Sequence, residues 1–160
     1  MNLTYLLIGG NIGNRMGNLD TAINFIKKDI GRIVSASSIY ETAAWGITEQ
    51  LDFLNQVLLV ITKFSPQETM QAILSIENKM GRIRTQKNAS RIIDIDILFF
   101  NDEIIDEPGL TVPHPEIQNR RFVLEPLAEL SPLLVHPILK KSISELLSDC
   151  KDDLEVKLFK

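Results

Sequence analysis

The order of strand-like and helix-like segments is the feature that most constrains the fold of this chain. Short β-prone runs alternate with two stretches in which apolar residues recur every three or four positions. The strand-like runs cover residues 3–8, 32–42, 54–62 and 91–100, and the helical stretches cover 18–30 and 65–80. Residues 101–119 then predict a loop, followed by short helices near 122–130 and 142–147. The order β-α-β-β-α-β predicts an α+β sandwich, with two helices on one face of a mostly antiparallel sheet and the other face open.

The helix over 65–80 carries the clearest boundary signals in the chain. Ser65 is its expected N-cap, Pro66 its first residue, Glu68 completes a capping box, and Gly81 ends it. For the earlier helix, Asn18 is the expected N-cap.

Length and charge bound the class of protein. A chain of 160 residues with 44% hydrophobic and 24% charged residues predicts a single globular domain over residues 1–160. A net charge of −4 argues against nucleic acid as a partner. The one cysteine excludes an internal disulfide framework and a multi-cysteine zinc site. Because no long apolar stretch or basic leader is present, we expect a cytoplasmic protein without a membrane partner.

Two aspartates interrupt the last strand-like run. Alternation predicts that Asp94 and Asp96 share one face of the strand, about 6.6–7 Å apart at their Cα atoms. The same alternation places Leu98 and Phe100 with the aspartates, and Ile93, Ile95, Ile97 and Phe99 on the core face. Paired carboxylates suit Mg²⁺, which takes its remaining ligands from water and phosphate. A solvated sheet face on which both aspartates meet water is an equally good interpretation of this motif alone.

A basic segment leads directly into this strand. Residues 82–91 contain Arg82, Arg84, Lys87 and Arg91 and no acid, where an even distribution of cations would put about one. Arginine side chains match phosphate oxygens, so the segment could close over a polyphosphate held by metal ions at the aspartates. An ordinary solvated basic loop is the alternative.

Polar residues also occur where the pattern expects hydrophobic ones. Glu77 lies within the apolar stripe of the second helix, where a carboxylate needs a partner. It could instead reach solvent at the helix end, or pair with Arg82 or Arg84. Asn55 lies near the start of an apolar strand and offers an amide for recognition.

Histidines and glycines add weaker signals. His114 stands between two prolines, and Arg120 follows as a further phosphate contact, although a loop histidine bonded to backbone explains His114 equally well. His136 is expected to be structural. The glycines near residue 10 do not form a P-loop or a dinucleotide fingerprint, so any nucleotide binds by another route.

Together these motifs resemble the 6-hydroxymethyl-7,8-dihydropterin pyrophosphokinase family over most of the chain. The resemblance rests on the runs 8–11, 41–46, 53–55, 77–84, 91–97 and 110–122. It implies a ferredoxin-like fold and transfer of a pyrophosphoryl group from ATP to the hydroxymethyl oxygen of the pterin, with release of AMP. Reactions of this kind need positioning, metal ions and cations more than covalent chemistry from the protein, and no residue is singled out as a general base.

The resemblance also implies roles for individual residues. Two Mg²⁺ ions would bind Asp94 and Asp96, and Arg82 and Arg91 would be the arginines of the closing loop. ATP would lie against Glu77, Arg84, Ile97, Thr111, His114 and Arg120. The pterin would be bound by Thr42, Ala44, Trp45, Phe53, Asn55 and Phe122. We expect the enzyme to be a monomer.

The chain departs from the family pattern at two places. The family usually has an aromatic residue and Gly-Pro before the last loop arginine, whereas this chain has Lys87-Asn-Ala-Ser-Arg91, one residue shorter. Where the family often has a pair of prolines, this chain has Ala43-Ala44.

Two other functions remain open. One is a Mg²⁺-dependent phosphotransferase or nucleotidyltransferase acting on another small alcohol. The other is a noncatalytic module such as an RNA-recognition domain, against which the acidic aspartate strand argues.

Overall fold

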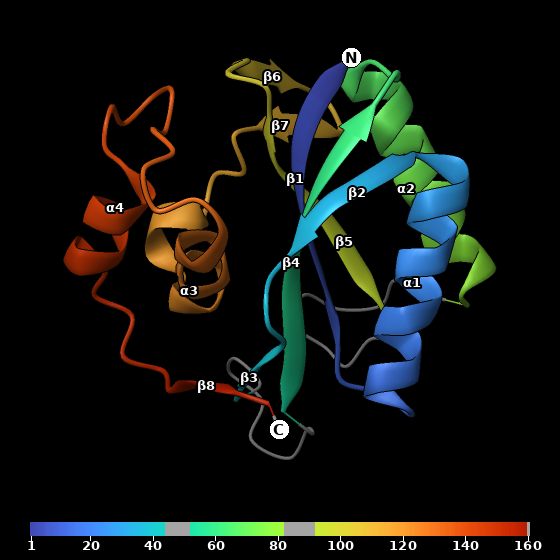
Figure 1. Ribbon diagram of the computed structural model, residues 1–160, viewed down its shortest axis with the longest axis horizontal. Coiled ribbons are helices and arrows are strands. Elements are labelled where there is room, and N and C mark those ends of the chain that lie inside the picture. The colour runs from blue at the N-terminus through green and yellow to red at the C-terminus, as the bar shows by residue number, and fades with distance from the viewer. Residues whose placement is uncertain (44–51, 82–91, 160) are drawn as a thin grey trace.

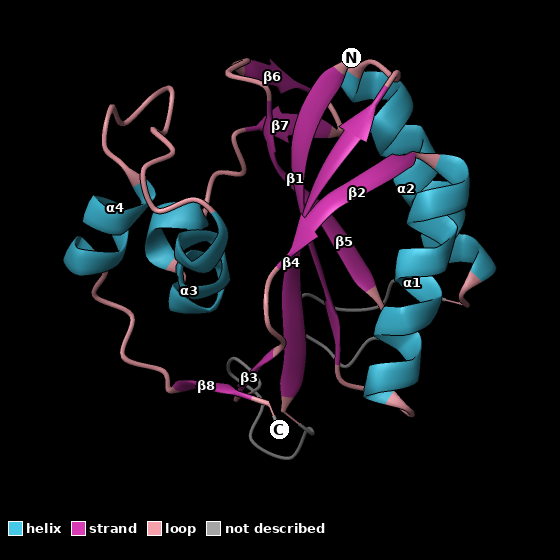
Figure 2. Cartoon of the chain, viewed as in Figure 1, coloured by secondary structure: helices cyan, strands magenta, loops and turns pink. Residues whose placement is uncertain are grey.

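The computed structural model describes residues 1–43, 52–81 and 92–159. Strands and helices alternate along the chain, with helices on both sides of a central sheet (Figures 1 and 2). In chain order the elements are β1 (Asn2–Gly10), α1 (Arg15–Asp29), β2 (Gly31–Ala36), β3 (Tyr40–Thr42), β4 (Phe53–Thr62), α2 (Pro66–Lys79), β5 (Asp94–Phe100), β6 (Ile105–Glu107), β7 (Leu110–Val112), η1 (Ile117–Asn119), α3 (Arg121–Leu130), α4 (Ile143–Asp149) and β8 (Val156–Leu158).

The main sheet has the predicted topology. Within the described ranges its strand order is β5-β1-β4-β3-β8, and β2 pairs with β4 beside β3. Every strand pair that the described residues form in it is antiparallel. The units β1-α1-β2 and β4-α2-β5 therefore interleave as in a ferredoxin-like fold, which confirms the predicted fold class.

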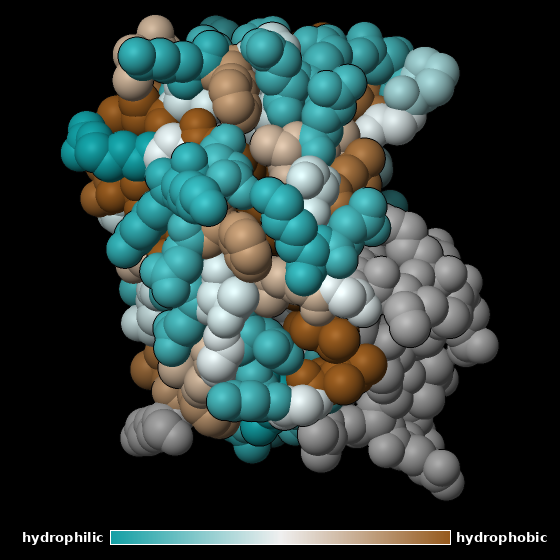
Figure 3. All heavy atoms as spheres, turned by 90° about the vertical axis from the view of Figure 1, so that its right-hand side faces the viewer, coloured by the Kyte–Doolittle hydropathy of each residue, from teal (hydrophilic) through white to brown (hydrophobic). Residues whose placement is uncertain are grey.

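Two hydrophobic cores lie on opposite faces of the sheet. The first is formed with α1 and α2, through residues such as Ile26 and Ile73. The second is formed with α3 and α4, through residues such as Leu124 and Leu146. The expectation of an open second face was therefore wrong for the part that α3 and α4 cover (Figure 1). The outer surface of α1 and α2 is largely hydrophilic, as expected for helices that bury one apolar stripe (Figure 3).

A β-bulge changes which side chains of β5 face which core. Tyr5 pairs with Phe99 and Leu6 with Ile97, so Leu98 is an extra residue in β5. Ile95, Ile97 and Phe100 consequently lie in the core under α1 and α2. Leu98 and Phe99 lie in the core under α3 and α4. The faces predicted for Phe99 and Phe100 by strict alternation were wrong, because the bulge shifts the alternation by one residue.

The helix boundaries follow short-range capping. Ser65 accepts a hydrogen bond from the N–H of Glu68 in a capping box, as predicted. Helix α1 starts earlier than expected: its N-cap is Asn14, whose side chain accepts a hydrogen bond from the N–H of Gly17. Asn18 donates its side-chain amide to the carbonyl of Ile12 instead.

Two segments are more structured than the sequence predicts. The run 32–42 is divided into β2 and β3 at Ser37, whose hydroxyl and backbone bond to β4. Residues 101–119, expected as a loop, contain the hairpin β6–β7 and the 3₁₀ helix η1.

Candidate active site

A row of polar residues crosses the sheet at the strand ends, on the face that carries α3. Asp94 is opposite Gly9, and Gly9 is opposite Asn55. Directly opposed residues of antiparallel strands point to the same face, so Asp94 and Asn55 share it across the intervening strand β1. Asp96 is opposite Leu7, which belongs to the core under α3. The aspartates thus lie on the α3 side of the sheet, where its apolar core ends.

Gly9 leaves room for the side chain of Asn55. A Cβ atom at Gly9 would lie 2.2 Å from Oδ1 of Asn55 and 2.7 Å from the carbonyl oxygen of Leu54. Asn55 is 6% exposed, and the closeness of its Oδ1 to Gly9 places its side chain over β1. The glycine of the GGN run is needed for close packing rather than for a phosphate loop.

Thr42 and Phe53 lie on the same face beside Asn55. They form the last pair of β3 and β4, two residues along β4 from Asn55. Thr42 is buried, and its Oγ1 has no hydrogen-bond partner among the described residues. A buried hydroxyl of this kind is costly unless something bonds to it, which makes it a candidate ligand contact.

Glu77 binds the outer edge of β5. Its carboxylate Oε2 accepts a hydrogen bond from the N–H of Ile95 at 2.8 Å, and the residue is 2% exposed. Burial rules out the interpretation of Glu77 as a solvent-facing residue at the helix end. The bond ties α2 to β5 at the residue between the two aspartates, and so helps to hold both carboxylates in place.

His114 lies along β5, with its Nδ1 acting as a hydrogen-bond acceptor. Its backbone N–H donates to the carbonyl of Leu98 at 3.0 Å, and its Nδ1 accepts from the N–H of Glu116 at 3.1 Å. Burial, followed by the nearby charge of Arg120, lowers the pKa of His114, and Asp94 partly opposes this shift. Because Nδ1 is an acceptor, the ring proton is on Nε2, which can donate to a ligand.

Arg120 is the N-cap residue of α3, and Phe122 is the second residue of this helix. The guanidinium carbon of Arg120 is 5.8 Å from the centroid of the Phe122 ring. Phe122 is half-buried and packs against the core beneath α3. Since both Arg120 and Asp94 act on the pKa of His114, these three side chains form one electrostatic neighbourhood.

The remaining predicted residues are placed differently. The side chain of Ile97 lies in the core under α2, on the face opposite the aspartates. Thr111 is exposed on β7. The predicted contacts Arg82, Arg84, Arg91, Ala44 and Trp45 lie outside the described residues, so their predictions stay untested.

His136 is structural, as predicted. It is buried, and its Nδ1 accepts hydrogen bonds from the N–H groups of Ile138 and Leu139. Burial lowers the pKa of this histidine as well.

The sequence interpretation missed one charged group at this end of the sheet. Arg15, the first residue of α1, donates to the carboxylate of Glu41 and to the carbonyl of Asp52, both at 2.8 Å. The arginine occurs four residues after Asn11 in a turn-like run, and no periodicity distinguishes it from a solvated residue.

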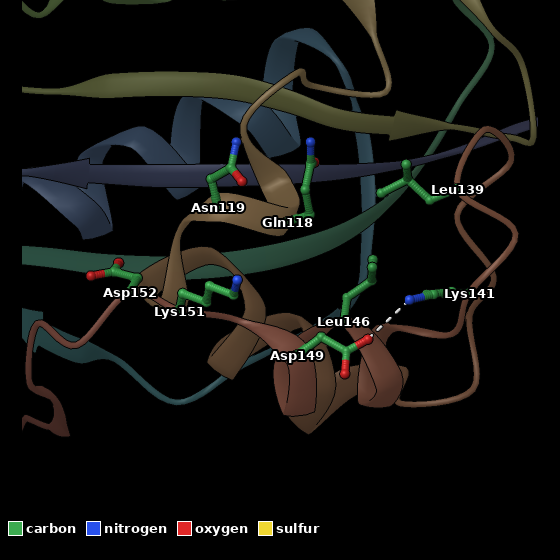
Figure 4. Close-up of a pocket in the computed structure, with 8 residues that line it drawn as sticks. All are labelled: Gln118, Asn119, Leu139, Lys141, Leu146, Asp149, Lys151 and Asp152. Carbon is green, nitrogen blue, oxygen red and sulfur yellow. Dashed lines mark hydrogen bonds and ion pairs between the residues drawn. The ribbon is translucent and has the colours of Figure 1, made fainter.

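The structure also contains a pocket of about 370 Å³ (Figure 4). It opens between η1 and α4, where Lys141 and Asp149 form an ion pair at 3.0 Å. Its lining residues are Gln118, Asn119, Leu139, Lys141, Leu146, Asp149, Lys151 and Asp152. None of them is a predicted site residue.

The described part of the chain contains no group of three or more His, Cys, Asp or Glu residues able to hold a metal ion. A Mg²⁺ ion bound by one or two carboxylates usually completes its coordination with water and phosphate oxygens. Among the same residues, no helix has the length and apolar character needed to cross a membrane.

Comparisons with known proteins agree on one family. A family model described as 7,8-dihydro-6-hydroxymethylpterin-pyrophosphokinase (HPPK) matches residues 5–132. The 2-amino-4-hydroxy-6-hydroxymethyldihydropteridine pyrophosphokinase of Aquifex aeolicus is 39% identical over 145 residues, which cover 91% of this chain and 90% of that protein.

Longer proteins contain a similar region. Folic acid synthesis protein fol1 of Schizosaccharomyces pombe is 40% identical over 146 residues, covering 91% of this chain and 20% of that protein. The chain thus spans about a fifth of the yeast protein. A crystal structure of Plasmodium falciparum HPPK-DHPS, wild type with STZ-DHP, has a TM-score of 0.78 at 20% identity, covering 92% of this chain and 43% of that one. This structural likeness supports the fold.

Proposed function

The chain belongs to the 7,8-dihydro-6-hydroxymethylpterin-pyrophosphokinase family, and we propose that it transfers a pyrophosphoryl group from ATP to 6-hydroxymethyl-7,8-dihydropterin. The products are AMP and the pterin diphosphate. The observation that carries this function is the polar row Asp94–Gly9–Asn55 across three strands. The row places the carboxylate pair about two strand spacings, roughly 10 Å, from the Asn55 amide on one face of the sheet. The proposed reaction requires such a separation, because the site must hold phosphate groups and a heterocycle at the same time.

The carboxylates of Asp94 and Asp96 suit Mg²⁺. They are hard oxygen ligands on one face of one strand, and the hydrogen bond between Ile95 and Glu77 supports the strand between them. Two bound Mg²⁺ ions would neutralise the triphosphate and orient it. The arginines at 82, 84 and 91 are the proposed further counter-charges.

The nucleotide is proposed to lie along β5 and the start of α3. His114 is held neutral, so that its Nε2–H is available as a hydrogen-bond donor without carrying charge. Arg120 supplies a cation next to it. Glu77, Ile97 and Thr111 complete the proposed nucleotide contacts. The buried side chain of Ile97 favours a contact through its backbone.

The pterin is proposed to lie at the other end of the row. Asn55 offers an amide that pairs with the polar edge of a heterocycle, and the Oγ1 of Thr42 offers a buried hydroxyl. Phe53 and Phe122 supply aromatic rings for stacking on the flat ring system. Ala44 and Trp45 are the further proposed contacts.

Catalysis by such a site consists mainly of positioning. The hydroxymethyl oxygen attacks the β-phosphorus of ATP, the bond from that phosphorus to the α-phosphate oxygen breaks, and AMP leaves. Side chains that hold the two substrates in line and neutralise charge supply most of the rate enhancement.

Product analysis tests the reaction against the alternative transferases. With ATP, Mg²⁺ and 6-hydroxymethyl-7,8-dihydropterin, chromatography should show AMP and pterin diphosphate in equal amounts. Formation of ADP would indicate phosphoryl transfer, and release of pyrophosphate would indicate nucleotidyl transfer. Either result would contradict the proposal.

Calorimetry tests whether both substrates bind. The pterin should bind measurably in the presence of Mg²⁺ and an unreactive ATP analogue. Nucleotide binding without any pterin binding would favour another acceptor alcohol, and salt-sensitive RNA binding without turnover would favour a noncatalytic module.

A further inference from the structure

Arg15 connects three segments at the end of the sheet where the pterin is proposed to bind. Its Nη1 donates to Oε2 of Glu41 on β3 and to the carbonyl oxygen of Asp52, both at 2.8 Å. Its guanidinium carbon lies 5.5 Å from the centroid of the Phe159 ring, near the C-terminus. One planar cation thus bonds to two strand ends and packs against an aromatic ring, a combination that suits arginine better than lysine.

The two acceptors flank the residues proposed to contact the pterin. Glu41 directly precedes Thr42, and Asp52 directly precedes Phe53. Thr42 and Phe53 face each other as the last pair of β3 and β4. Arg15 therefore joins the two strands at the Thr42–Phe53 pair, beside the Asn55 end of the polar row.

Arg15 acts from the opposite side of the sheet. Glu41 is paired with Leu54, which lies in the core under α1 and α2. The Arg15–Glu41 pair is thus on the α1 face, whereas Thr42, Phe53 and Asn55 face α3. Because the Arg15–Glu41 pair and the proposed pterin contacts lie on opposite faces, the effect of Arg15 on those contacts passes through the backbone of β3 and β4.

The Arg15–Glu41 ion pair is partly buried. The Arg15 and Glu41 side chains are 22% and 18% exposed. An exposed surface ion pair has little effect on stability, but partial burial and a second hydrogen bond strengthen this one.

The C-terminal segment completes the arrangement. Strand β8 pairs with β3, with Val156 opposite Thr42. The N–H of Phe159 donates to the carbonyl of Ile39 at 2.9 Å, which fixes the position of its ring over Arg15. Strand β3 is therefore held by β4, β8 and Arg15 together.

From these contacts we infer that Arg15 is a positioning residue for the pterin site. It fixes Thr42 relative to Phe53 through Glu41 and Asp52, and the C-terminal segment shields it. This inference rests on the proposed function, because it assumes that Thr42 and Phe53 contact the pterin.

Calorimetry on the full chain separates a positioning role from a general loss of structure. Arg15→Ala should weaken pterin binding about ten-fold in the presence of Mg²⁺ and an unreactive ATP analogue. The affinity for the analogue itself should change less than about two-fold, because the proposed nucleotide contacts lie on β5 and α3. Arg15→Lys, which keeps the charge, should restore part of the pterin affinity. Arg32→Ala, at an exposed arginine on β2, should change neither affinity.

The outcomes are distinguishable from failure of the proposed function. If the unmodified protein does not bind the pterin, the proposed function and this inference both fail. If it binds the pterin and Arg15→Ala binds it equally well, only the inference fails. An equal loss of affinity for both ligands also overturns it, because it indicates a general structural effect.

A milder variant covers the case in which Arg15→Ala does not fold. Phe159→Leu keeps an apolar side chain but removes the aromatic ring next to the guanidinium. It should weaken pterin binding about three-fold and leave the affinity for the ATP analogue unchanged. Unchanged pterin binding in a folded Phe159→Leu protein would contradict the role of the C-terminal segment. If the Arg15→Ala protein also failed to fold, that result would overturn the whole inference.

Discussion

The two faces of the sheet show how one set of strands serves both stability and binding. The face under α1 and α2 is largely apolar, with Leu6, Ile8 and Leu58 among its buried residues, and the Arg15–Glu41 ion pair lies at one end of it. The face under α3 and α4 is apolar only near the helices, and it becomes polar at Asp94 and Asn55. Alternation along each strand makes this division possible, since neighbouring residues point to opposite faces. Substitutions on the two faces should therefore affect different properties.

The largest effect is expected at Asp96. Asp96→Asn keeps the size of the side chain but halves the proposed pair of metal-binding charges, so AMP release should slow on the order of 10³-fold. The free energy of unfolding, measured with urea, should change by less than about 1 kcal/mol, because the residue is partly exposed.

Asp106→Asn is the matched control for this variant. Asp106 is an exposed aspartate on the short strand β6, and its substitution should leave the rate unchanged. Equal rates for the Asp96 variant and the unmodified enzyme would remove the carboxylate pair from the mechanism.

The opposite behaviour is expected on the apolar face. Leu58 is fully buried between the sheet and α1 and α2, so Leu58→Ala should lower the free energy of unfolding by about 2–5 kcal/mol. The KM values of the folded enzyme should stay unchanged. Leu74→Ala, at a leucine of α2 that is 43% exposed, should cost much less. If the Leu58 variant loses substrate affinity without losing stability, the two faces are not separable.

A substitution at Gly9 should affect both stability and pterin binding. Gly9→Ala puts a Cβ atom against Asn55 and against the backbone of Leu54, and should lower the free energy of unfolding by about 1–3 kcal/mol. It should also raise the KM for the pterin, because Asn55 must move. In the double variant Gly9→Ala/Asn55→Ala only part of the stability should return, since the contact with the Leu54 carbonyl remains. Full recovery of stability in the double variant would show that the Asn55 side chain alone excludes a Cβ atom at position 9.

The smallest effect is expected from protonation of His114. The folded protein holds its pKa below the ordinary value of 6.5, through burial and the charge of Arg120. Below that pH the unfolded chain takes up the proton first, so the free energy of unfolding falls as the pH decreases. His114→Gln should therefore lose less stability than the unmodified protein between about pH 7 and about pH 5.5, as measured by urea unfolding.

His136 provides the internal comparison for this experiment. Its pKa is also lowered by burial, so some pH dependence should persist in the His114 variant. An identical pH profile for the variant and the unmodified protein would show that the surroundings of His114 do not lower its pKa in the folded state.

Much of the fold was predictable because its signals are short-range. The capping box at Ser65 involves residues within one helical turn, and the Asp-X-Asp pattern places both aspartates on one strand face. The motifs around them were also specific enough to identify the family, which the comparisons confirm.

Other features depend on pairing between distant segments, and no local pattern reports them. The bulge at Leu98 arises from the fit of β5 against β1, and it exchanged the faces of Phe99 and Phe100. The sequence showed Glu77 as a charged residue within an apolar stripe. It did not show that Glu77 bonds to the N–H of Ile95, because that contact depends on the packing of α2 along β5.

Local patterns were therefore enough to predict the main β-α-β-β-α-β series, its order, and the chemical types brought to the site. Local backbone preferences and alternation act within a few residues, and they are sufficient for this. The row of Asp94, Gly9 and Asn55, and the link from Glu41 to Asp52 through Arg15, follow from the folded arrangement and not from any local pattern. These relations depend on strand register and helix packing, which bring together residues separated by up to 85 positions, Gly9 and Asp94 among them.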